Sequence, residues 1–498
     1  MQIKAGNDFF EAKNGKVLPV ILDTKKLLNP HMLILGVSGA GKSHTIRNFV
    51  HQGRHATPRV QFHILDVHND LDIEGASVVT FSAQAKFGLN PLIVNPDVEF
   101  GGVEKCIRTF LRVLNQASSM KLGVQQEDCV RELLLDVYHE FGFESNDPST
   151  WAINEYETRL ISGGKDNRLY MEVPIAEKDA AKELGARWDG EKKHWYVQTE
   201  NYKGDLLKWK PAFKARRYPT VTDVYNFARE MHEQRFLGSD QRCVRALGVT
   251  NKVAQNHHRQ TIAILKEKRV GYSDDATENA LDKSKLRAIE AYTEYVNSIK
   301  TGSELDNLMK YQSPEVLRST MIRLKGLIAS GIFKDELPDF DKNNNVWQYR
   351  LKAIEPDERR MYVLFKLQEL FSNASQRGVQ QDIVDIVVLD ELGSFTSAAD
   401  GEKGEGIIGV IAREARKFGL GMWAATQTPA TVPESLITAV ATKIVLGIDE
   451  KYTESVIKNF GIDRKLLSFI QPWHTIAVQL KEKGAAKSRW WWVNLEKQ

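Results

Sequence analysis

The hydrophobic pattern alternates between short, continuous apolar runs and longer segments whose apolar residues recur at helical spacing. A short continuous apolar run is typical of a parallel strand that is buried on both faces. Such runs occupy residues 32–35, 60–65, 385–389, 422–425 and 444–446. Helical spacing is clearest over residues 103–114 and 130–137. The alternation predicts an α/β fold with an open, mainly parallel sheet.

Both ends of the chain also carry strand patterns. Asn14-Gly15 is a hairpin-turn signal, and the apolar run 17–22 follows it, so residues 1–30 are predicted to form a β-ribbon. Residues 489–493 read Arg-Trp-Trp-Trp-Val, which is too aromatic for a free tail. We expect them to form a last strand or a clasp onto a neighbouring subunit.

The composition changes near residue 163. The Gly-rich, polar segment 163–167 is typical of a linker. The compact block that follows is predicted to contain a strand at 169–174, a helix at 176–184, a turn at 188–190 and a strand at 194–197. Residues 220–333 have a mainly helical and charged pattern, with loops expected at 274–284 and 339–345.

These boundaries predict an interrupted core domain. Residues 1–162 form its first part, 163–217 a small α+β insertion, 218–335 a helical subdomain and 336–498 the second part of the core.

The insertion mixes basic and aromatic residues, a pattern with two interpretations. Among others, it carries the basic residues Lys182, Arg187, Lys192, Lys193 and His194 and the aromatic residues Trp188, Trp195 and Tyr196. Such mixtures contact single-stranded nucleic acid in many proteins. Alternatively, the aromatic side chains are the core of a small module and the lysines are its solvated face. The core interpretation is slightly favoured for the tryptophans.

A nucleotide-binding motif follows the first apolar run. Residues 36–43 read Gly-Val-Ser-Gly-Ala-Gly-Lys-Ser, which is a P-loop between a predicted strand and a predicted helix. Its backbone N–H groups and the helix dipole favour phosphate, Lys42 would reach the β- and γ-phosphates, and the Ser43 hydroxyl would hold Mg²⁺. The residues expected to bind ATP are Gly36, Ser38, Gly39, Ala40, Gly41, Lys42, Ser43 and His44.

A second motif ends the apolar run 385–389. Asp390 and Glu391 follow this run directly, at the sheet edge where ligands bind in α/β folds. Asp390 is the expected Mg²⁺-binding carboxylate, and Glu391 would orient or deprotonate the attacking water. The polar residues 66–70 should reach the same edge, because they follow the run 60–65.

The run 422–425 ends in Thr426-Gln427, and Gln427 is the expected sensor of the γ-phosphate. The alternative is that this pair only caps the next turn. Arg413 and Arg416 lie just before the same run. In ring ATPases an arginine from the neighbouring subunit completes the site. A surface salt bridge is the alternative role for each arginine.

Bulk composition adds limits. The chain has 498 residues and a net charge of +3, so a nucleic-acid surface would have to be local or built by a ring of subunits. Three cysteines lack metal-ligand spacing and favour a reducing compartment. No stretch approaches about 18 apolar residues and no signal peptide is evident, so we expect a cytoplasmic protein without direct membrane insertion.

The ordered motifs resemble the HerA/FtsK superfamily of hexameric DNA-pumping ATPases, and HerA most closely. The matching segments are 31–36 running into the P-loop, Leu89-Asn90-Pro91-Leu92, 388–391, 416–419 and 425–427. The resemblance covers residues 1–160 and 215–498. It implies a RecA-like core with a helical subdomain, a homohexameric ring, and ATP-driven translocation of double-stranded DNA. The insertion resembles a small uncharacterised domain of conjugation and primase-like proteins.

Two departures from HerA are visible. Only about 30 residues precede the P-loop, too few for the N-terminal β-barrel of that family. The usual Gln-Arg-Pro is Gln427-Thr428-Pro429 here.

The leading hypothesis is a DNA translocase or helicase that works with a nuclease or other effector, in an anti-phage context. One alternative is a conjugation- or secretion-type transfer motor. Another is an ATP-gated scaffold that organises a partner enzyme.

Overall fold

The computed structural model describes residues 1–117, 121–153, 168–190, 193–198, 201–209, 212, 217–237, 241–266, 275–298, 310–396, 406–486 and 488–495. These residues form two compact units. The core unit contains Met1–Lys121, Gly142–Tyr218 and Ala329–Gln498, and the helical unit contains Leu122–Phe141 and Pro219–Ile328. The predicted linker 163–167 and Lys192 lie outside the described residues.

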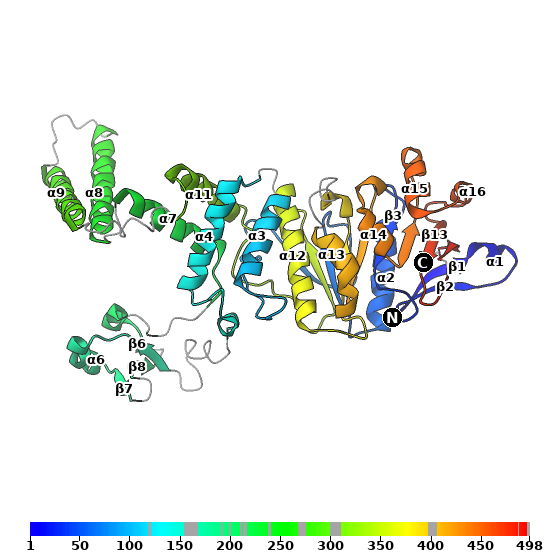
Figure 1. Ribbon diagram of the computed structural model, residues 1–498, viewed down its shortest axis with the longest axis horizontal. Coiled ribbons are helices and arrows are strands. Elements are labelled where there is room, and N and C mark those ends of the chain that lie inside the picture. The colour runs from blue at the N-terminus through cyan, green and yellow to red at the C-terminus, as the bar shows by residue number, and fades with distance from the viewer. Residues whose placement is uncertain are drawn as a thin grey trace. The chain divides into compact units, whose positions relative to one another are not determined.

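The core unit is built on one mixed sheet, which has 11 strands among the described residues (Figure 1). In spatial order they are β2 (Pro19–Asp23), β1 (Gln2–Asp8), β14 (Arg489–Asn494), β13 (Thr475–Leu480), β12 (Thr442–Val445), β3 (Met32–Leu35), β11 (Leu420–Thr426), β10 (Asp385–Leu389), β4 (Gln61–Asp66), β9 (Val346–Arg350) and β5 (Ser77–Thr80). Neighbouring strands from β12 to β5 pair in parallel, whereas β13, β14, β1 and β2 pair antiparallel. The predicted α/β class and its buried parallel strands are confirmed.

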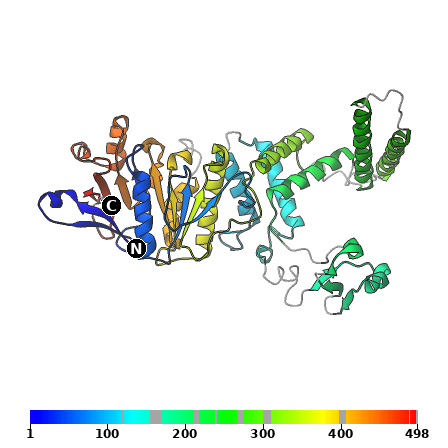
Figure 2. The same ribbon diagram turned by 180° about the vertical axis from the view of Figure 1, so that it is seen from behind.

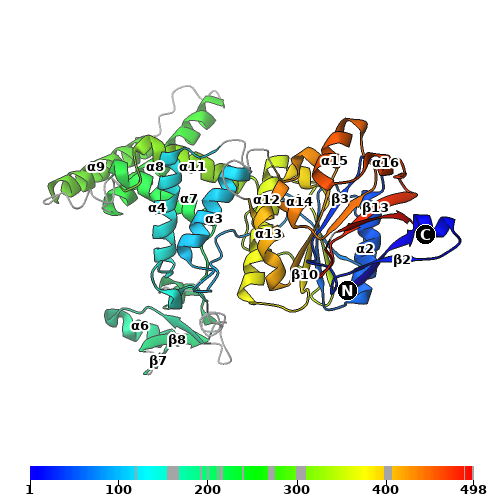
Figure 3. The ribbon, with the colours of Figure 1, turned by 45° about the vertical axis from the view of Figure 1, so that its right-hand side comes forward.

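Helices cover both faces of the parallel strands. Alternate strand residues point to opposite faces, and Ile34, Ile386 and Val388 pack in one apolar cluster with Phe49 of α2 (Lys42–Ala56). The opposite face is covered by α12 (Pro356–Gln376) and α13 (Ile407–Glu414), as Figure 3 shows, and Figure 2 views the molecule from the side of α2. Each such buried side chain contributes about 2 kcal/mol, so the strand ends are held in fixed positions.

Further helices of the core unit are α1 (Phe9–Lys13), α3 (Val103–Ala117), α14 (Glu434–Ala439), α15 (Thr453–Phe460) and α16 (Arg464–Leu467).

The N-terminal ribbon is confirmed, but its connection differs from the prediction. β1 and β2 pair antiparallel, yet α1 lies between them, capped by the Asp8 carboxylate, and β2 begins only at Pro19. The hairpin signal Asn14-Gly15 therefore ends this short helix, with Gly15 at φ +76°. The C-terminal aromatic segment is strand β14, which pairs with β13 and β1.

The helical unit contains α4 (Val124–Glu140), α7 (Val221–Leu237), α8 (Gln241–Lys266), α9 (Asp275–Ser298) and α11 (Pro314–Ala329). The expected loop at 274–284 was wrong from Asp275 onward, because these residues begin α9, which packs along α8. Residues just before α11 are tied to α4: Lys310 donates to Asp136 over 2.6 Å, and Gln312 donates to Asp128 over 2.6 Å.

The insertion has its own three-stranded antiparallel sheet, in the order β6 (Arg168–Met171), β8 (His194–Gln198), β7 (Arg187–Asp189), together with helix α6 (Lys178–Glu183). The predicted turn at 188–190 was wrong, since Trp188 and Asp189 belong to β7. Trp188 pairs with Trp195 there, and this ladder contact is a non-local interaction that a local turn pattern does not reveal. Within the described part of the chain, every helix is too short or too polar to cross a bilayer.

Candidate nucleotide-binding site

The P-loop connects β3 to α2, as predicted. Gly39 and Gly41 have φ of +78° and +93°, the left-handed region that glycine adopts without steric cost. Ser38 and Gly39 are exposed at the tip of the loop, and Ala40 is buried. The loop is anchored at Gly36, whose N–H donates to the Thr426 carbonyl over 3.1 Å.

The Lys42 ammonium lies over the P-loop. It donates to the carbonyl oxygens of Gly36 at 2.9 Å and Val37 at 3.2 Å. Desolvation lowers the pKa of Lys42, and the charges of Glu391, Asp390 and Asp70 act in the opposite direction. A partly desolvated cation surrounded by phosphate-binding backbone is suited to a polyanionic ligand.

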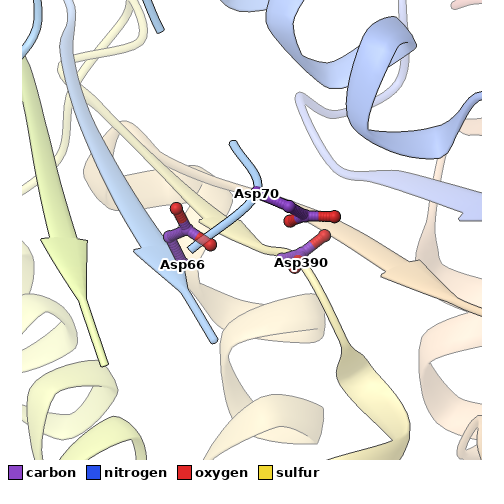
Figure 4. Close-up of side chains that lie close together, drawn as sticks. All are labelled: Asp66, Asp70 and Asp390. Atoms are coloured by element: carbon purple, nitrogen blue, oxygen red, sulfur yellow. The ribbon is translucent and has the colours of Figure 1, made fainter. Parts of the chain in front are cut away.

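Three carboxylates meet at the carboxyl edge of the sheet. Asp66 ends β4, Asp70 lies in the loop after it, and Asp390 follows β10; oxygens of all three lie within 4.8 Å of one another (Figure 4). Desolvation raises the pKa of Asp390 to about 8, with further contributions from Asp70, Asp66 and Glu391. Burial likewise raises the pKa of Asp66, and the hydrogen bond that Gln348 donates to this carboxylate acts in the opposite direction.

This cluster fits a hard divalent cation. Carboxylate and hydroxyl oxygens are ligands that Mg²⁺ prefers. Among the described residues, Asp390 Oδ2 and Asp66 Oδ1 are buried without a hydrogen-bond partner, which is a costly arrangement that a cation would relieve. The Ser43 hydroxyl joins the cluster by donating to Asp70 Oδ2 over 3.1 Å. The sequence placed Asp66 and Asp70 at this edge, but gave them no ligand role.

The predicted water-activating residue and the predicted sensor are in contact. Gln427 Nε2 donates to Glu391 Oε2 over 3.2 Å. Strand β11, which ends just before Gln427, lies between the P-loop strand β3 and the strand β10 that precedes Asp390 and Glu391. A side chain at this strand end therefore borders both motifs.

Arg413 and Arg416 are not part of this cluster. Both are exposed, and they precede β11 at the amino edge of the sheet. β11 has 7 residues and at about 3.3 Å per residue spans roughly 20 Å. An arginine side chain does not bridge that length, so neither residue reaches the P-loop of its own chain.

Trp473 is a neighbour of the P-loop that the sequence did not reveal. Its indole N–H donates to the Gly39 carbonyl over 2.7 Å, and its ring centroid lies 5.5 Å from that of His44. Trp473 adopts φ +66°, an outlier for a bulky residue. No motif marks it, because it precedes β13, far from the P-loop in the sequence.

Comparison with known proteins agrees with this geometry. Residues 11–101, which include the P-loop, match the family model "Helicase HerA, central domain". The chain has a P-loop ATPase core, and its residues 11–101 are similar to the central domain of the HerA helicases. This core is similar to the structure of VirB4 of Thermoanaerobacter pseudethanolicus, with a TM-score of 0.57 and 13% identity over 100% of this chain and 96% of that one.

This P-loop ATPase is less similar in structure to the plasmid coupling protein TrwB in complex with the ATP analogue ADPNP. The TM-score is 0.46, with 10% identity over 100% of this chain and 95% of that one.

Two further matches are confined to short segments of the chain. Residues 168–211 match a domain of unknown function (DUF5710). A segment of 45 residues is 47% identical to part of the DNA primase TraC of Escherichia coli. This match covers 9% of the chain and 3% of the primase, so the two proteins share one small module.

Proposed function

We propose that this P-loop ATPase is a ring-forming motor that uses ATP hydrolysis to translocate double-stranded DNA. The observation that carries the proposal is the set of groups at one sheet edge: Lys42 and Ser43 of the P-loop, Asp390 and Glu391 after β10, and Gln427 after β11. A water-activating carboxylate in contact with a sensor is what a hydrolysing motor needs to couple the γ-phosphate to movement. The match to the HerA helicase central domain supports DNA as the substrate.

Each residue has a proposed task. The P-loop N–H groups and Lys42 would bind the phosphates, and Ser43 and Asp390 would hold Mg²⁺, with Asp70 and Asp66 beside them. The ion would neutralise charge on the β- and γ-phosphates. Glu391 orients the attacking water and accepts its proton. Gln427, which is hydrogen-bonded to Glu391, would respond to cleavage of the γ-phosphate and transmit this change to strand β11.

The arginines support a ring. Because the amino edge lies roughly 20 Å from the P-loop along the strand direction, Arg413 and Arg416 act only if they enter the site of a neighbouring subunit. Both arginines are exposed on the surface of the chain.

Trp473 is proposed to border the nucleotide base, because its indole and the His44 ring flank the start of α2. Base–aromatic stacking is worth about 1–3 kcal/mol. Trp473→Ala should therefore weaken ATP binding about 5- to 100-fold and leave tripolyphosphate binding unchanged in calorimetry. Equal losses for both ligands would instead assign Trp473 to the shape of the P-loop.

The test of the motor is steady-state ATP hydrolysis with and without linear double-stranded DNA, combined with displacement of a third strand from a DNA triplex. Stimulation by DNA together with triplex displacement is the expected result, and the Glu391→Gln protein is the inactive control. ATP hydrolysis that DNA does not stimulate, together with no displacement of the third strand, would contradict the proposal and favour the ATP-gated scaffold.

A second candidate is a conjugation- or secretion-type DNA-transfer ATPase. The likeness to VirB4 over the whole chain, and the module shared with a primase named TraC, favour this setting. The nuclease partner, the anti-phage context and the six-subunit ring stay predictions. Co-purification of partners with the tagged protein, and its mass in solution, test them.

A further inference from the structure

The insertion has a small core that accounts for only part of its aromatic content. Met171, Ala181, Ala186, Val197, Leu206 and Trp209 are buried together. Trp209 is fixed there, since its indole N–H donates to Glu177 over 2.9 Å, and Trp195 packs against the same cluster. Trp188 is not a member of this core and is 53% exposed. The core interpretation therefore holds for Trp195 but leaves Trp188 unexplained.

Trp188 lines a groove together with residues at the end of β6 and at the start of β8. The groove has a volume of about 910 Å³, within the usual range of ligand sites. Its floor includes the indoles of Trp188 and Trp195, which meet edge to face with centroids 5.7 Å apart. Pro174 and the exposed Ile175 add apolar surface.

Charge in this groove is mainly positive. Lys178, Lys193 and His194 line it together with one carboxylate among the described lining residues, that of Glu172. Lys178 and Lys193 are exposed, so their ammonium groups remain solvated beside the aromatic floor. A flat, accessible indole in a groove with two exposed cations is the combination that binds a stacked base and its phosphates.

We propose that this groove is a binding site for single-stranded nucleic acid, with one base stacked on Trp188 and the backbone next to Lys178 and Lys193. A single strand fits better than a duplex, because a duplex keeps its base faces stacked inside and offers none to Trp188. The site is separate from the nucleotide-binding cluster and does not depend on hydrolysis. It gives the protein a contact to single strands beside its proposed action on duplex DNA.

Binding of fluorescein-labelled oligothymidylate to the full-length protein tests the site. Anisotropy is measured without ATP and with excess unlabelled duplex, which occupies duplex sites elsewhere. Trp188→Ala is expected to weaken binding about 5- to 100-fold, whereas Trp188→Phe retains most of the affinity. Lys178→Glu combined with Lys193→Glu should also weaken binding and flatten its salt dependence. An oligouridylate arm shows whether the site prefers DNA or RNA.

Lys182→Glu is the matched control, since Lys182 is exposed on α6 of the same module but does not line the groove. It should bind the oligonucleotide as the unchanged protein does, and ATP hydrolysis should be equal in all variants. Wild-type affinity in Trp188→Ala and in the double-lysine variant would overturn the proposal. An equal loss in Lys182→Glu would also overturn it, because binding would then follow overall charge.

Discussion

The two edges of the parallel sheet differ in chemistry, although the same strands connect them. At the carboxyl edge, Asp66 and Asp390 hold buried oxygens without partners, next to the cation of Lys42. At the amino edge, Arg413 and Arg416 are exposed and His31 is buried. The carboxyl edge thus collects the groups that are proposed to bind and hydrolyse a nucleotide, whereas the amino edge presents cations outward. A single chain cannot bring both sets together, so in the proposed ring the arginines would have to act on the site of a neighbouring subunit.

The largest expected effect is at the carboxyl edge. Lys42→Ala removes the phosphate-facing cation, which should cost about 100-fold in ATP affinity and about 100-fold in transition-state stabilisation. Calorimetry with ATP and steady-state hydrolysis measure both losses. Lys25→Ala, at an exposed position after β2, is the matched control. Normal turnover by the Lys42→Ala protein would remove the P-loop from the catalytic site.

Arg413→Ala and Arg416→Ala test the amino edge. If either arginine enters a neighbouring site, its loss should lower turnover about 1000-fold and leave ATP binding unchanged. Mixing each variant with the Lys42→Ala protein should restore part of the activity, because some interfaces then combine an intact P-loop with an intact arginine.

Lys417→Ala, the exposed neighbour of Arg416, should behave as the unchanged protein. If mixing the arginine variants with the Lys42→Ala protein restored no activity, the arginines of one subunit would not complete the site of its neighbour.

Glu391→Gln separates hydrolysis from binding at the carboxyl edge. The amide cannot accept a proton from water, so turnover should fall at least about 100-fold, while ATP affinity stays close to that of the unchanged protein. Glu414→Gln alters an exposed carboxylate at the amino edge and serves as the control. Turnover within a few-fold of normal in Glu391→Gln would move the role of base to another residue.

The sequence predicted the carboxyl edge well because its groups follow continuous apolar runs. Strands such as 32–35 and 385–389 are recognised locally, and parallel pairing brings their ends together, so Lys42, Asp390 and Gln427 were placed at one edge. The same logic placed residues 66–70 at this edge, but only the fold shows that Asp66, Asp70 and Asp390 share a cluster.

Other features depend on contacts that no local pattern encodes. Trp473 contacts the P-loop, although it lies 434 residues after its hydrogen-bond partner Gly39 in the sequence. Trp188 resembles a turn residue next to Gly190, but cross-strand pairing with Trp195 makes it part of β7. The amphipathic start of α9 was taken for a loop, because its stability comes from packing along α8.

The smallest expected effect concerns the buried histidine of the amino edge. His31 Nδ1 accepts a hydrogen bond from the Met422 N–H over 3.1 Å. Desolvation, with a contribution from Arg416, lowers the pKa of His31 from 6.5 to about 4. In the unfolded chain, His31 therefore binds a proton as the pH falls below 6.5. In the folded chain, it binds this proton only near pH 4. Stability from this group is complete above the unfolded pKa and declines as the pH falls towards the folded one.

His31→Asn keeps an acceptor for the Met422 N–H but cannot be protonated in this range. The unchanged protein should lose up to about 3 kcal/mol more stability than His31→Asn between neutral pH and pH 4. Urea unfolding at a series of pH values measures the difference. His51→Asn, at an exposed position on α2, should retain the acid dependence of the unchanged protein. If the free energy of unfolding of His31→Asn and of the unchanged protein had the same pH dependence, the folded chain would accommodate a protonated His31. The positive charge of the amino edge would then extend into the core.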